Sequence, residues 1–127
     1  MSKIDFGKVV TAEEKAKNAC NALREQIRRR RELAVNAGVV VEGMTFHTDD
    51  VSQQRIFSAA VSAMRDPTLI VKWKTASGAF VSLDAGAVLT TADAVRSHVQ
   101  ACYEREAALL VQLDAGDCPD VDSGWPV

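Results

Sequence analysis

The stretch LIVKWKTASGAFVSL, residues 69–83, has the pattern of a complete β-hairpin and decides the fold of the chain. In its first half, Leu69, Val71 and Trp73 alternate with Ile70 and two lysines. A strand therefore turns Trp73 toward the interior and the lysines toward solvent. Gly78 suits the turn because it accepts a positive φ without a Cβ clash. Phe80 continues the alternation on the return strand. We therefore expect Trp73, Gly78 and Phe80 to be structural residues of this hairpin.

The size and composition of the chain indicate one soluble domain. It has 127 residues, of which 47% are hydrophobic and 25% charged, values typical of globular proteins. No stretch approaches the roughly 18 apolar residues that a membrane-spanning helix needs. The first residues, MSKIDFGK, lack the apolar segment of a secretory signal. We expect synthesis in the cytoplasm and no contact with a membrane.

Two long helices are predicted on either side of the hairpin. The first begins after Thr11, which forms a capping box with Glu14, and spans about residues 12–37. Its apolar stripe is narrow and rich in alanine, so it should pack against another helix. The second opens at Thr90 or Thr91, after a tight turn over residues 84–89, and runs to about residue 115. Its buried stripe includes Val95, Val99 and Cys102.

The middle of the chain predicts a second hairpin and a shorter helix. Residues 39–47 contain two β-rich runs around a Glu-Gly turn, and residues 51–65 carry a helical apolar stripe that Asp66-Pro67 ends. The fold class is therefore α+β: two long helices and one shorter helix packed with two β-hairpins that form a small antiparallel sheet. We divide the chain into an N-terminal arm (1–11), a single α+β domain (12–116) and an acidic C-terminal tail (117–127).

The most conspicuous charge run is made of four arginines, Arg28, Arg29, Arg30 and Arg31. Successive helical residues lie about 100° apart, so the run spreads around the helix. Glu25 and Glu32 lie within i,i+4 reach of Arg29 and Arg28. These features favour a solvated helix surface with local ion pairs; binding of an acidic protein surface is the alternative. We expect no nucleic-acid binding, because no aromatic residues interleave with the arginines.

Charge is distributed unevenly along the chain. Residues 1–47 hold nine Lys or Arg against six Asp or Glu, a balance of +3, whereas residues 84–127 hold two against eight, a balance of −6. Opposite charges of this kind let two elements of one fold, or two subunits, lie side by side. Together with the narrow helix stripes they predict a homo-oligomer.

The chain carries no pattern typical of a catalytic or metal site. Its three cysteines lack C-x-x-C spacing, and only His47 and His98 could join them. His98 has no nucleophile motif beside it, so we expect a structural role. The pair Asp49-Asp50 precedes a helix, where acids usually serve the cap and the dipole. We therefore expect no enzyme activity, cofactor or metal.

Trp125 is the exception in the acidic tail. An aromatic residue close to a chain end is either docked onto the domain or offered to a partner. We therefore count Trp125, together with the four arginines of the run, as a candidate partner contact.

The chain resembles a phage and prophage family, a domain of unknown function that recurs on bacteriophage tail-fibre and tail-fibre-assembly proteins. The resemblance rests on four motifs: V-x-x-G-x-x-F-x-T-D (residues 40–49), S-Q-x-x-I (52–56), W-K-T-A-S-G-x-F-V-x-L-D (73–84) and A-V-R-x-H-V-Q-A-C-Y-x-R-E-A-A-L (94–109). The family is similar over most of the chain, and no catalytic residues are known for it.

This resemblance implies a phage tail accessory protein, either a tail-fibre assembly chaperone or a small component of the tail tip. Its partner would be a phage tail or tail-fibre protein. It would reside in the host cytoplasm, with the virion tail as a second location. The alternative is a phage-encoded regulator that binds a host or defence protein.

Overall fold

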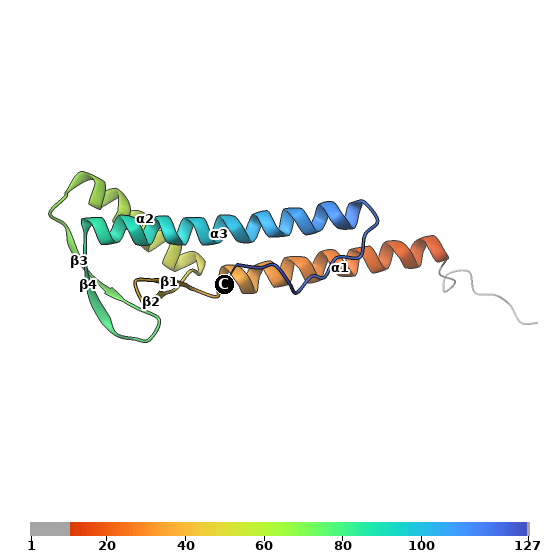
Figure 1. Ribbon diagram of the computed structural model, residues 1–127, viewed down its shortest axis with the longest axis horizontal. Coiled ribbons are helices and arrows are strands. Elements are labelled where there is room, and N and C mark those ends of the chain that lie inside the picture. Colours follow the sequence, from red (N-terminus) through yellow and green to blue (C-terminus); the bar gives the residue numbers. More distant parts are fainter. Residues whose placement is uncertain (1–10, 127) are drawn as a thin grey trace, which may run out of the picture.

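Three helices and two hairpins make up the computed structural model, which describes residues 11–126. The elements follow in the order α1 (Ala12–Val35), β1 (Val39–Val41), β2 (Met44–Phe46), α2 (Asp50–Arg65), β3 (Ile70–Lys74), β4 (Phe80–Asp84) and α3 (Ala85–Asp114). α1 and α3 run antiparallel along the long axis, and α2 and both hairpins gather where α3 begins (Figure 1). The predicted α+β class is confirmed, with each hairpin forming its own two-stranded sheet. The predicted N-terminal arm, apart from Thr11, lies outside the described residues.

The two ends of α1 are fixed by hydrogen bonds that the local sequence encodes. The predicted capping box is present, with Thr11 and Glu14 each accepting from the other's backbone N–H. The helix ends at Val35, two residues before the predicted end. There the buried hydroxyl of Thr48 donates to the carbonyl of Val35 and accepts from the N–H of Gly38 at 2.9 Å. One side chain thus joins the end of α1 to the start of α2.

α3 begins earlier than the sequence predicted. Its first residue is Ala85, so the expected tight turn over residues 84–89 and the start at Thr90 or Thr91 are wrong. Asp84 is the N-cap, and its carboxylate accepts from the N–H of Ala87 at 2.8 Å. The Thr91 hydroxyl donates to the Ala87 carbonyl, a bond made inside a continuing helix rather than at its start. The predicted Gly116 does end α3, at a φ of +87°.

The hairpin of β3 and β4 confirms two of its three predicted structural residues. Gly78 occupies the turn with φ +89°. Trp73 is half-buried and packs on the core, opposite Val81. The prediction for Phe80 is wrong, because its side chain is 64% exposed. In the antiparallel register Val81 shares the face of Trp73, so Phe80 falls on the outer face opposite Lys74.

Two hydrophobic clusters lie one after the other along α3. The first joins α2 and both hairpins to the first half of α3 and includes Val95. The second joins α1 and the tail to the second half of α3 and includes Cys102. Val95 and Cys102 are buried as predicted, and Val99 is half-buried and packs against both clusters. Among residues 11–126, no helix combines the length and apolar character needed to cross a membrane.

Candidate functional site

The first half of the arginine run lies on the outer surface of α1. Arg28 forms ion pairs with Glu25 and, at 2.6 Å, with Glu32. Arg29 lies 3.3 Å from Glu25. The hydrogen bond from Arg28 holds the pKa of Glu25 below its ordinary value. The predicted local ion pairs are therefore confirmed, and they occupy the guanidinium groups on this side of the helix.

The second half of the run joins α1 to its neighbours. The Arg30 guanidinium lies 5.6 Å from the centre of the Trp125 ring, and that of Arg31 lies 4.8 Å from the centre of the Tyr103 ring. Arg31 also donates to Glu106 on α3 at 3.3 Å. A guanidinium over an aromatic face is attracted by the ring quadrupole. These two arginines therefore contribute to the packing of the domain.

Trp125 belongs to the second cluster. Its side chain is 8% exposed, and its indole N–H donates to the carbonyl of Val121 at 2.8 Å. This burial contradicts its assignment as a partner contact and supports the other alternative, a tail docked onto the domain. The acidic tail runs back along the helix pair (Figure 1), and the Trp125 ring packs into the second cluster.

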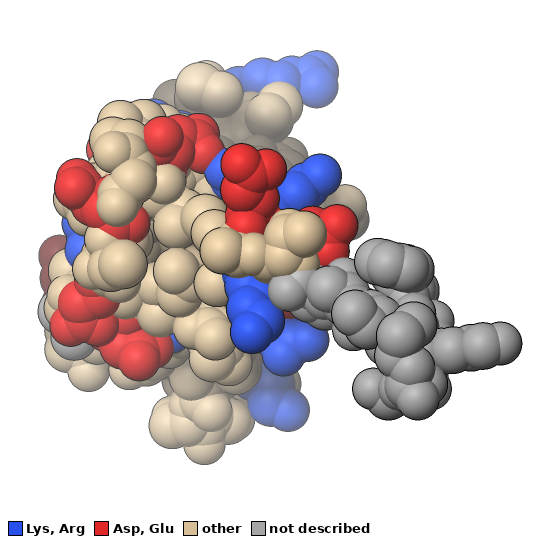
Figure 2. Space-filling view, turned by 90° about the vertical axis from the view of Figure 1, so that its right-hand side faces the viewer, with Lys and Arg blue, Asp and Glu red and all other residues tan. Residues whose placement is uncertain are grey.

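The unequal charges of the chain meet within one molecule. α1 contributes the basic members of three ion pairs whose acidic partners lie in α3 or the tail: Arg24–Asp114, Arg30–Asp122 and Arg31–Glu106. Viewed from the end where α1 begins and α3 finishes, acidic side chains predominate on one side and basic ones on the other (Figure 2). The predicted attraction between the basic and acidic parts of the chain is thus realised, in part, by ion pairs within one molecule.

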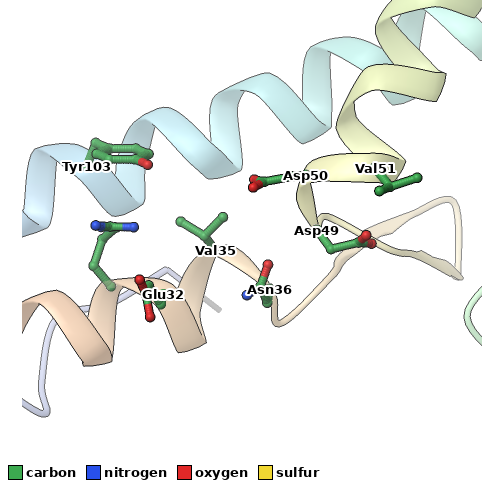
Figure 3. A pocket seen from close by; sticks show the side chains of 8 residues that line it. Glu32, Val35, Asn36, Asp49, Asp50, Val51 and Tyr103 are labelled. Carbon is green, nitrogen blue, oxygen red and sulfur yellow. The ribbon is translucent and has the colours of Figure 1, made fainter.

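A cleft of about 390 Å³ opens where α1 ends, α2 begins and α3 passes its midpoint. Its lining is mostly polar: Arg31, Glu32, Val35, Asn36, Asp49, Asp50, Val51 and Tyr103. Asp50 is directed into the cleft toward the side where Tyr103 lies, whereas Asp49 points away (Figure 3). The sequence had assigned both acids to the helix start. Asp49 is indeed the N-cap residue, but its carboxylate accepts from the Ser52 hydroxyl instead of the backbone.

One acid of this cleft is a weak base, and two of its lining side chains are exposed. The Ser52 hydroxyl holds the pKa of Asp49 below its ordinary value, so Asp49 is a poor base near neutral pH. Tyr103 and Val51 are exposed at the rim. Sequence reasoning did not select Tyr103 or Val51, since only the packing of three helices brings them together. No group of three potential metal ligands occurs among residues 11–126.

His98 and Cys102 lie close together but are closed to substrates. The Nε2 atom of His98 is 2.8 Å from the carbonyl oxygen of Ala34 and 3.8 Å from the Sγ atom of Cys102. Both side chains are buried, and burial raises the pKa of the Cys102 thiol. A neutral, enclosed thiol is a weak nucleophile. The pair therefore fixes the end of α1 against α3.

These observations define an elongated α+β domain built on an antiparallel helix pair, with a polar cleft at the junction of its helices. The chain belongs to the family described as Domain of unknown function (DUF4376), whose model matches residues 16–123. That match runs from the first half of α1 to the docked tail. Neither a curated protein nor a solved structure matches the chain.

Proposed function

We propose that this protein is a phage tail accessory protein, a tail-fibre assembly chaperone or a small component of the tail tip, that acts through contacts with a tail or tail-fibre protein. The observation that carries the proposal is the resemblance of its four motifs to the domain that recurs on bacteriophage tail-fibre and tail-fibre-assembly proteins. All four motifs lie within residues 16–123, the part of the chain that the DUF4376 family model matches.

The surface of the domain supports a role in protein contacts. Large apolar side chains are exposed on both long helices, on α2 and on the main hairpin, among them Leu33, Met64, Ile70, Phe80 and Val111. Such residues are common singly at a protein surface. The cleft adds an open concave site with the exposed side chains of Tyr103 and Val51 at its rim. We assign the cleft at the helix junction as the primary contact.

Affinity purification from infected cells tests the proposal. Tagged protein should recover a tail or tail-fibre protein in stoichiometric amount, and mass spectrometry of purified particles then separates a structural component from a chaperone. Recovery of only host or defence proteins would instead support the alternative of a phage-encoded regulator.

Two matched variants test the role of the cleft. Val51 at its rim and Val61 farther along α2 are 53% and 52% exposed. Val51→Lys should reduce recovery of the tail protein at least about tenfold, because a lysine at a contact must be desolvated. Val61→Lys makes the same change outside the cleft lining and should leave recovery unchanged. Equal recovery of the tail protein with the two variants would show that the cleft is not part of the contact.

A further inference from the structure

A basic groove lies between β3 and the start of α2, apart from the cleft at the helix junction. Its volume is about 390 Å³, and six of its lining residues are His47, Arg55, Lys72, Trp73, Lys74 and Phe80. No Asp or Glu lines it. Within residues 11–126 Arg55, Lys72 and Lys74 form no ion pair, in contrast to Arg28, Arg29, Arg30 and Arg31. The groove therefore concentrates three positive charges that the described domain does not neutralise.

The edge of β3 that β4 does not cover supplies a second, independent feature. Thr75 donates its N–H to the carbonyl of Ala79 directly opposite, which makes these two residues a hydrogen-bonded pair. Hydrogen-bonded and non-bonded pairs alternate along an antiparallel ladder. Given the register of Lys74 opposite Phe80 and Lys72 opposite Ser82, the backbone groups of both lysines point away from β4. No other described hydrogen bond uses them. Two residues beyond Lys74, the N–H of Ala76 donates to the carbonyl of Thr45 on β2 at 2.8 Å, so the free stretch of this edge ends at Lys74.

We propose that this groove binds an extended acidic segment of a partner protein, which adds to the open edge of β3 as a third strand. Main-chain hydrogen bonds to Lys72 and Lys74 would align the segment, as in other cases of strand addition. Carboxylates of the segment would face the two lysines and Arg55. The rings of Trp73 and Phe80 offer apolar area beside these cations. The inference goes beyond the proposed function and does not depend on the cleft.

The same features disfavour two other occupants. Pairing of this edge with itself in a second copy would set lysines close to lysines, and like charges across a strand pair are destabilising. A nucleic acid would need a basic track several nucleotides long. Arg55, Lys72 and Lys74 are the three Lys or Arg residues that line this groove, and the whole chain has a net charge of −2. An acidic peptide requires only the local charge and the open strand edge.

Binding is tested with fluorescein-labelled peptides and the full-length protein. The probe is GEVEVETG, and its controls are GKVKVKTG, which reverses the charge, and GEPEPETG, which keeps it but cannot form a continuous strand. We expect saturable binding of the first peptide and at least about tenfold weaker binding of both controls. Equal binding of the proline peptide would overturn strand addition, and equal binding of the lysine peptide would overturn charge recognition. Tighter binding of single-stranded DNA (dT12) would also overturn the proposal, in favour of a nucleic-acid partner.

A pair of double variants separates the groove from net charge. Lys72→Glu with Lys74→Glu should weaken binding of GEVEVETG at least about tenfold. Lys15→Glu with Lys17→Glu makes the same charge change on the exposed first half of α1 and should alter binding less than about twofold. Similar loss in both would show non-specific attraction and contradict the proposal. Circular dichroism confirms that both variants fold.

Amide hydrogen exchange reports strand addition directly. The N–H groups of Lys72 and Lys74 point to the open edge, whereas that of Trp73 is in the ladder. Saturating GEVEVETG should slow exchange at Lys72 and Lys74 at least about tenfold and change Trp73 much less. Binding without protection of the two lysine amides would rule out a third strand.

Discussion

At the scale of single residues, Thr48 shows how one buried hydroxyl links the end of α1 to the start of α2. It is fully buried, donates to Val35 and accepts from Gly38. Thr48→Val keeps the shape of the side chain but leaves both backbone groups without their partner. We expect the free energy of unfolding to fall by about 1–3 kcal/mol. Urea denaturation measures it, with Thr90→Val on the exposed side of α3 as a control that should cost less than about 0.5 kcal/mol.

Asp66 provides a prediction of pH dependence. Its carboxylate accepts from the N–H and the hydroxyl of Thr68, which holds its pKa below the ordinary value. A folded-state pKa that is depressed adds stability above the unfolded-state pKa and loses it as the pH falls through the folded-state value. Thr68→Val should raise the pKa of Asp66 toward the ordinary value of an aspartate, as measured by NMR titration. An unchanged pKa would show that the backbone N–H alone sets it.

At the scale of elements, the pairing of α1 with α3 depends on Arg31. Arg31 and Glu106 have side chains only 17% and 18% exposed, and the guanidinium also covers Tyr103. Arg31→Ala leaves a half-buried carboxylate unpaired and should lower the free energy of unfolding by about 1–3 kcal/mol. Arg29→Ala removes a pair at a side chain that is 70% exposed and should cost less than about 1 kcal/mol. Equal costs would mean that the inter-helix pair adds nothing.

Elements with strong local signals were predictable from the sequence. Thr11 and Glu14 place the start of α1, and Gly78 places the hairpin turn, because these signals act within a few residues. The start of α3 was missed because Asp84 serves as both the last strand residue and the helix cap. Phe80 was misplaced because the face of a short strand depends on its register with β3. The cleft and the groove were out of reach, since their residues come from separate elements.

At the scale of the whole molecule, the exposed first half of α1 favours self-association. Residues 11–19 are all exposed, and Ala12, Ala16 and Ala19 lie on one side of this segment. Light scattering should give a mass above 13.7 kDa that rises with concentration. Ala16→Glu should weaken association, whereas Asn18→Glu, with the same charge change on the opposite side, should not. A mass of one chain at every concentration would contradict this prediction.

The two clusters along α3 predict that the molecule opens in two parts. Ile27 is fully buried in the second cluster and Ile56 is buried in the first, and Val99 packs against both. Replacing a buried isoleucine by alanine costs about 2–5 kcal/mol. Because regions with few shared contacts unfold at different free energies, Ile27→Ala should speed exchange in α1, the tail and the second half of α3 before it affects α2.

Ile56→Ala is the matched variant for the other part. It should speed exchange in α2 and the hairpins first, because these elements depend on the first cluster. Hydrogen exchange followed by mass spectrometry resolves both halves of α3 in one experiment. A uniform rise across residues 11–126 in both variants would show that α3, which runs through both clusters, couples them into one cooperative unit. Separate responses would mean that a partner can open or close the α1 end while the β3 groove stays folded.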